Sequence, residues 1–262
     1  MERKTAIVTG AGTGIGQGVA ITLGQNGYDV VVHYNSSAEG AEEACRQIRD
    51  CGGRAWPVQA DLSAMSGVRE LFAQAMEKLG HLDLYVNNSG ITRKSDFLET
   101  TEDFFDRMVD VDLKSAYFCV QAAAREMVCR DTKGSIVIIT SNNGLQQRPN
   151  LSVYGTLKAG LIKLGRHAAM ELAKYQIRVN TIAPGWTATP RTMELDETTT
   201  YNSIPLKRWC RPEEIGHMIL FLASPWAASI TGNCLVADGG AVLQSDLSLI
   251  HISEPTRLDV IS

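Results

Sequence analysis

The chain has 262 residues, of which 44% are hydrophobic and 21% are charged, a composition typical of a globular protein. Its net charge of −4, without any run of Lys or Arg, argues against nucleic-acid binding, and no apolar stretch reaches the roughly 18 residues that a membrane span needs. The six cysteines contain no Cys-x-x-Cys pair and the five histidines have no ligand spacing, so we expect no metal site. Without a signal-peptide core at its start, the chain is expected to be cytoplasmic and to form one large domain.

The first predicted element is a short apolar strand at residues 5–9, which a glycine-rich turn connects to a helix reaching about residue 25. A glycine loop alone is often a plain turn, but between a strand and a helix it is typical of dinucleotide binding. Glycines allow the backbone to approach a pyrophosphate, which binds at the helix N-terminus. The residues predicted to form this loop are Gly10, Thr13, Gly14, Ile15 and Gly16.

Strands and helices alternate along the rest of the chain. Further strands are predicted at residues 28–34, 54–60, 82–86, 133–140, 177–183 and 234–237. Helices are predicted at 38–50, 64–79, 101–109, 113–130, 152–174 and 212–223. The alternation predicts an α/β fold with a single Rossmann-type, doubly wound parallel sheet of order 3-2-1-4-5-6-7. Pro57 agrees with this order, because proline cannot donate to a sheet ladder and the third strand is at the edge.

The ends of the second and third strands are expected to meet the adenosine of the cofactor. A carboxylate at the end of the second strand would bind the 2′-hydroxyl and repel a 2′-phosphate, but Tyr34 stands there, followed by Asn35, Ser36 and Ser37. Asp61 closes the third strand. It could accept a hydrogen bond from the adenine amino group, cap the following helix, or do both.

Ser141 follows a buried strand, and Tyr154 and Lys158 stand at i and i+4 on the next predicted helix, so their side chains share a face. A phenol has an unperturbed pKa of about 10, and a neighbouring ammonium favours the phenolate. A Tyr-x-x-x-Lys pair can therefore carry out acid/base chemistry near neutral pH, while a serine hydroxyl orients a carbonyl group. Such a pair also occurs on helices by chance, so its weight comes from the other motifs.

Together the motifs resemble the short-chain dehydrogenase/reductase family, and within it the 3-oxoacyl-carrier-protein reductases and glucose 1-dehydrogenases. They are Thr9-Gly10-x-x-x-Gly14-Ile15-Gly16, Asn87-Asn88-Ser89-Gly90, Ser141, Tyr154-x-x-x-Lys158 and Pro184-Gly185. The resemblance implies hydride transfer between NADP(H) or NAD(H) and a secondary alcohol/ketone pair. It implies that Tyr154 is the acid/base, that Lys158 assists it and holds the nicotinamide ribose, and that Ser141 orients the carbonyl. It further implies cofactor contacts at Asp61, Leu62, Asn88, Gly90, Pro184, Gly185, Thr187 and Thr189.

One departure from the family concerns Asp112, which stands where the family has an asparagine that positions a water linking the lysine to solvent. An aspartate keeps an oxygen but loses the amide donor and adds charge. We keep Asp112 among the catalytic candidates. The alternative is a catalytically weak dinucleotide-binding regulatory protein.

The cofactor is predicted to be NADP(H), with NAD(H) as the alternative. Ser36 and Ser37, with backbone amides at a helix start, could donate to a 2′-phosphate, although Thr13 replaces the cation common in NADP-binding members. The resemblance implies a homotetramer or homodimer that pairs the helices at 113–130 and 152–174. Residues 142–153 and a lid at 190–211 are expected to select the small-molecule substrate. Residues 247–262 resemble a translated sequencing adaptor, so the native domain is taken as 1–246.

Overall fold

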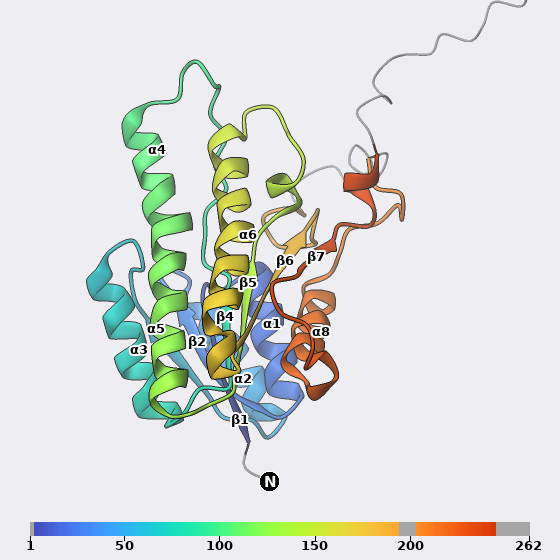
Figure 1. Ribbon diagram of the computed structural model, residues 1–262. Helices are drawn as coiled ribbons and strands as arrows, with labels where there is room; N and C mark the ends of the chain where they lie inside the picture. Colours follow the sequence, from blue (N-terminus) through green and yellow to red (C-terminus); the bar gives the residue numbers. More distant parts are fainter. Residues whose placement is uncertain (1–2, 194–202, 245–262) are drawn as a thin grey trace, which may run out of the picture.

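The computed structural model describes residues 3–193 and 203–244, where seven strands alternate with helices (Figure 1). The strands are β1 (Lys4–Val8), β2 (Tyr28–Tyr34), β3 (Ala55–Gln59), β4 (Leu84–Asn87), β5 (Ser135–Ile139), β6 (Arg178–Pro184) and β7 (Cys234–Ala237). They form one parallel sheet with the order β3-β2-β1-β4-β5-β6-β7. The predicted strand order is confirmed, including the edge position of Pro57 on β3.

Helices cover both faces of the sheet, as buried parallel strands require. One face carries α1 (Gly14–Gln25), α2 (Ala38–Asp50) and α8 (Pro212–Ala223), and the other carries α3 (Met65–Leu79), α5 (Ser115–Cys129) and α6 (Ser152–Leu172). Successive side chains of β1 enter opposite cores. Ile7 packs on the side of α3, α5 and α6, whereas Ala6 and Val8 pack on the side of α1, α2 and α8.

The two helices predicted at 101–109 and 113–130 form one continuous helical run. A π-helical turn, Val109–Lys114, joins α4 (Glu102–Met108) directly to α5. Such turns insert an extra residue and are frequent at functional sites. Here the turn contains Asp112, whose side chain is fully buried. Apolar spacing alone suggested a break at this point, because the π turn changes the helical phase.

Asp61 does not cap the helix that follows it. The N-cap of α3 is Ala64, which makes no side-chain capping bond. The carboxylate of Asp61 instead accepts hydrogen bonds from the backbone N–H and the hydroxyl of Ser63, at 3.0 and 2.8 Å. The capping interpretation is therefore wrong.

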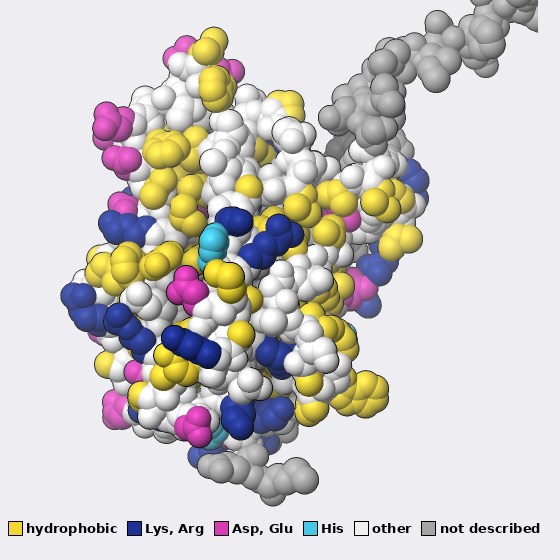
Figure 2. Space-filling view, viewed as in Figure 1, with side chains coloured by type: hydrophobic (Ala, Val, Ile, Leu, Met, Phe, Trp, Pro, Cys, Tyr) yellow, Lys and Arg dark blue, Asp and Glu magenta, His cyan; other side chains and the backbone are white. Residues whose placement is uncertain are grey.

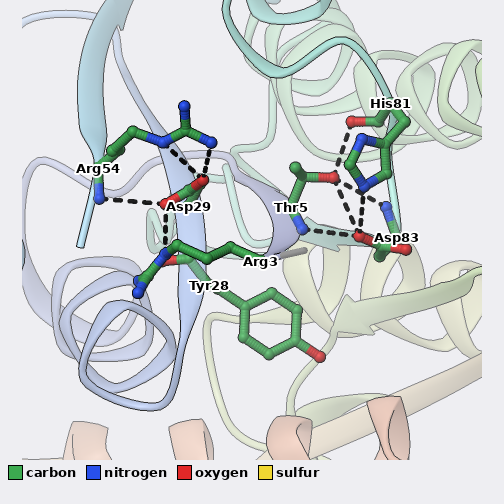
Figure 3. A network of polar contacts seen from close by, with 7 residues as sticks. All are labelled: Arg3, Thr5, Tyr28, Asp29, Arg54, His81 and Asp83. Carbon is green, nitrogen blue, oxygen red and sulfur yellow. Dashed lines mark hydrogen bonds and ion pairs between the residues drawn. The ribbon is translucent and has the colours of Figure 1, made fainter. Parts of the chain in front are cut away.

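A polar network closes the amino-terminal edge of the sheet (Figure 3). Asp29 accepts from Nε of Arg3 at 2.7 Å and from Nε of Arg54 at 2.8 Å. Asp83 accepts from the backbone N–H of Thr5 at 2.7 Å. Burial alone would raise the pKa of Asp29, but the hydrogen bonds from Arg54 and Arg3 hold it below its usual value. The polar side chains at the amino-terminal ends of the strands therefore stabilise the fold. The carboxyl-terminal ends of the strands are the place where a ligand is expected.

Residues 194–202 of the lid and the whole tail at 247–262 lie outside the described residues. Within the described ranges, no helix has the length and apolar character needed to cross a bilayer.

Candidate active site

The carboxyl ends of the strands meet at one edge, where the glycine loop of residues 9–16 packs against the end of β4. Nδ2 of Asn88 donates to the carbonyl oxygens of Thr9 and Gly10, at 3.0 and 3.2 Å. A Cβ atom at Gly16, in the first turn of α1, would lie 2.4 Å from the Gly10 oxygen, so a larger residue does not fit in this position. Asn88 therefore supports the loop, and it also lines a cavity beside it.

His33 on β2 supports the same loop. Its Nδ1 accepts from the backbone N–H of Gly10 at 3.1 Å, so its Nε2, at 3.1 Å from the Ala60 oxygen, is the atom that donates. Burial lowers the pKa of His33 to about 4, which keeps the ring neutral near pH 7. Sequence reasoning missed this residue, because a single histidine in an apolar strand forms no motif.

A cavity of about 320 Å³ lies beside the glycine loop. It is lined by half of the residues predicted to bind the cofactor, namely Gly10, Thr13, Tyr34, Asn35, Ser36, Asp61, Leu62, Asn88 and Gly90. Arg107 of α4 also lines the cavity and was not predicted. It was missed because no motif links α4 to the end of β3. Glycine-rich backbone, a helix N-terminus and polar side chains together fit the adenosine half of a dinucleotide.

The remaining predicted cofactor residues lie outside the lining of this cavity. Gly14, Ile15 and Gly16 form the first turn of α1. The side chain of Thr189 lies beside that turn, since its Cγ2 would be 3.4 Å from a Cβ on Gly14. Pro184 ends β6, and Gly185 and the buried Thr187 follow it. The loop after β6 therefore approaches the N-terminus of α1, where a pyrophosphate would bind.

Lys158 lies near two other predicted catalytic residues. Its Nζ lies 3.7 Å from Oδ1 of Asp112 and 5.4 Å from the centre of the Tyr154 ring. Tyr154 is 9% exposed, Lys158 5% and Asp112 0%, so their charges are poorly screened by solvent. Burial raises the pKa of Asp112, opposed by the charge of Lys158 and by the Ile91 N–H, which donates to Oδ1 at 2.9 Å.

Gly90 is required by this arrangement. A Cβ at residue 90 would lie 2.3 Å from Oδ1 of Asp112 and 3.2 Å from Nζ of Lys158. Any side chain here would displace the carboxylate or the ammonium, which gives Gly90 a steric role besides lining the cavity.

Ser141 lies directly before the short helical turn Asn142–Gly144, which precedes α6 in the chain. Its Oγ accepts from the backbone N–H and from Nδ2 of Asn143, at 3.2 and 3.3 Å. Because both bonds use the lone pairs of the oxygen, the hydroxyl hydrogen can be donated to a ligand. The turn after Ser141 packs closely on α6, since a Cβ at Gly155 would lie 2.9 Å from the Asn143 oxygen. Ser141 and Tyr154 are thus held on adjoining segments.

The chain is similar to known proteins over nearly its whole length. A family model described as enoyl-(acyl carrier protein) reductase matches residues 10–242. A 3-oxoacyl-[acyl-carrier-protein] reductase from Synechocystis sp. is 36% identical, with 93% of this chain and 98% of the relative covered. A 2-dehydro-3-deoxy-D-gluconate 5-dehydrogenase from Escherichia coli is also 36% identical, with 92% and 96% covered. The structure of an angucycline C-6 ketoreductase with bound NADP matches with a TM-score of 0.85 at 33% identity, covering 92% of this chain and 96% of that one.

Proposed function

The chain belongs to the short-chain dehydrogenase/reductase family and is an NAD(P)-dependent oxidoreductase, and we propose that Tyr154 is the acid/base for an alcohol/ketone pair. The observation that carries this proposal is the placement of the Lys158 ammonium near both the Tyr154 ring and the Asp112 carboxylate. The nicotinamide cofactor supplies or takes up the hydride when it is bound. In reduction, the Tyr154 hydroxyl gives its proton to the substrate oxygen, which the Ser141 hydroxyl holds in place.

Cofactor binding is assigned to the residues at the carboxyl edge. The Gly10–Gly16 loop and the N-terminus of α1 would hold the pyrophosphate, with Thr189 beside them. Asp61, Leu62 and Asn88 would surround the adenosine, and Lys158 would hold the nicotinamide ribose. Pro184, Gly185 and Thr187 would contact the carboxamide end. The donors and the cavity of this chain fit such a ligand.

NADP(H) is proposed as the preferred cofactor. No carboxylate ends β2, where Tyr34 stands, and Ser36 lines the adenosine cavity beside Asn35. Two hydrogen bonds to a phosphate, at roughly 1.5–3 kcal/mol each, would favour NADP(H) by an order of magnitude or more. NADP bound in the ketoreductase neighbour supports this choice. With Thr13 instead of a cation, use of NAD(H) as well is expected.

A catalytically weak dinucleotide-binding regulator is the rival function, and Asp112 is the residue that favours it. Where the family has an asparagine that positions a water linking the lysine to solvent, this chain has a buried carboxylate. Its Oδ2 atom has no hydrogen-bond partner among the described residues. We assign Asp112 to the active site because it also pairs with Lys158. A purified sample tested on ketones and secondary alcohols with both cofactors decides between the two. Turnover supports the enzyme, whereas tight cofactor binding without turnover supports the regulator.

A homotetramer or homodimer is proposed, with α5 and α6 of one subunit covering those of another. A cavity of about 740 Å³ lies between these helices, and Tyr117 and Tyr175 beside it are 49% and 42% exposed. Figure 2 shows hydrophobic side chains spread over this face among charged ones. A second copy fits because the exposed apolar groups continue along both helices. Light scattering at micromolar concentration tests this, and a monomeric mass would reject it.

The single domain at 1–246 and the cytoplasmic location stay predictions.

A further inference from the structure

Four buried side-chain atoms in the described part of the chain have no hydrogen-bond partner, and all four belong to segments that form the candidate site. One is Oδ2 of Asp112. The others are Oδ1 of Asn143, Nε2 of Gln146 and Nε1 of Trp186, which lie in the segments that follow β5 and β6. Buried polar groups are rarely left unpaired, because they lose their bonds to water without replacement, so such a concentration indicates that a ligand supplies the missing partners.

The two segments adjoin the catalytic serine. Asn143 donates from Nδ2 to Oγ of Ser141 at 3.3 Å, and Gln146 belongs to the same turn, with its backbone N–H bonded to the Asn142 oxygen at 2.9 Å. The loop after β6 approaches this turn, since a Cβ at Gly185 would lie 3.2 Å from Nδ2 of Asn142. Trp186 is the next residue. The unpaired groups therefore belong to two adjoining segments, one of which begins at Ser141.

A cation that forms no ion pair within the described part of the chain, Arg148, belongs to the first of these segments. The guanidinium of Arg148 is 5.5 Å from the centre of the Trp186 ring, which also stacks on Trp209 at 5.9 Å. Arg148 forms no ion pair and no side-chain hydrogen bond with another described residue, and burial lowers its pKa. Asp238 attracts it from a distance. The Asp238 carboxylate, however, already accepts from the backbone N–H groups of residues 240 and 242 and from Asn142.

We propose that the substrate is a small keto or hydroxy acid whose carboxylate binds Arg148, with further hydrogen bonds from Trp186 Nε1 and Gln146 Nε2. This inference rests on the proposed function and adds the substrate class. A planar guanidinium matches a carboxylate, and both neutral groups are donors that need acceptor oxygens. Oδ1 of Asn143 is an acceptor and would take a substrate hydroxyl. An apolar acyl chain in this position would leave all these groups unpaired.

The first test compares keto acids with their methyl esters and with acyl thioesters, using wild-type protein and NADPH. The acid is expected to exceed its ester in kcat/KM by about tenfold or more, since the ester loses a charged hydrogen-bonded pair. A preference for the ester or for an acyl thioester would overturn the proposal.

The second test determines whether Arg148 causes the preference for the acid over the ester. In Arg148→Met, which keeps an unbranched side chain but removes the guanidinium, the acid-to-ester ratio is expected to fall to about one, and Arg148→Lys should recover part of it. Arg69→Met, on the exposed face of α3, is the matched control and should keep the wild-type ratio. Thermal melting shows whether each variant is folded. A folded Arg148→Met protein with the wild-type ratio contradicts the inference.

Failure of the proposed function can be told apart from failure of this inference. If no carbonyl compound is turned over, the enzyme assignment fails, and binding is then measured by tryptophan fluorescence of the protein saturated with NADP⁺. A fluorescence change with the keto acids but not with the esters, lost in Arg148→Met, supports an anion site at Trp186. No acid-specific change rejects it.

Discussion

Asp112 and Lys158 form a buried ion pair, with 3.7 Å between Oδ1 and Nζ. The ammonium of Lys158 also faces the Tyr154 ring, at 5.4 Å from its centre. The carboxylate therefore holds the Lys158 side chain in place beside the phenol ring that we propose as the acid/base.

Replacing Asp112 by asparagine is expected to shift the pH profile of the reaction. Burial raises the pKa of the Asp112 carboxyl, and its protonation at acid pH would remove its charge from beside Lys158, so wild type should show an acid-side decline of kcat that Asp112→Asn, which does not titrate, lacks. The profile is measured with NADPH and one ketone. Asp110→Asn is the control, because Asp110 lies on the same π turn but is partly exposed and pairs with Lys114. Identical profiles for wild type and Asp112→Asn would contradict this role of the ion pair.

His33 is expected to make folding stability depend on pH. Its pKa is about 4 in the folded chain and about 6.5 when unfolded, so the unfolded state binds more protons between these values. The contribution of His33 to the free energy of unfolding is then fully present above pH 6.5. It is lost, by about 3 kcal/mol in total, as the pH drops toward and through 4.

Chemical denaturation of His33→Gln over this pH range provides the measurement. The glutamine can donate to Ala60 and accept from Gly10 but does not titrate, so the acid loss should shrink. His217→Gln, on the exposed side of α8, should retain it. If His33→Gln loses stability with falling pH as steeply as wild type does, His33 is not the responsible group.

Cofactor preference is expected to depend on Ser36. Ser36→Asp places a carboxylate at the end of the adenosine cavity proposed for the 2′-phosphate, so kcat/KM with NADPH should fall tenfold or more relative to NADH. Ser63→Asp adds the same charge beside Asp61, in the part assigned to adenine, and should affect both cofactors alike. A wild-type preference for NADH, or an unchanged ratio in Ser36→Asp, would contradict the NADP(H) assignment.

Much of the fold follows from local pattern. Buried β-branched strands and the edge position of Pro57 predict the sheet order, and short-range spacing places Tyr154 and Lys158 on one helix face. The contacts of Asp112 depend on a π turn, which helical periodicity does not indicate. Arg148, Trp186 and Trp209 come from three separate segments, and His33 acts through hydrogen bonds to two different loops. These relationships arise only from the tertiary arrangement, so the sequence gives no local signal for them.

The most direct test of the proposed mechanism is kcat of Tyr154→Phe with NADPH and the best ketone. Loss of the phenolic proton donor is expected to lower kcat by about 10²–10⁴-fold while cofactor affinity, measured by titration, changes little. Lys163→Met, on the exposed side of α6, is the control for changes in this helix. A folded Tyr154→Phe protein that keeps the wild-type kcat would show that Tyr154 is not the acid/base.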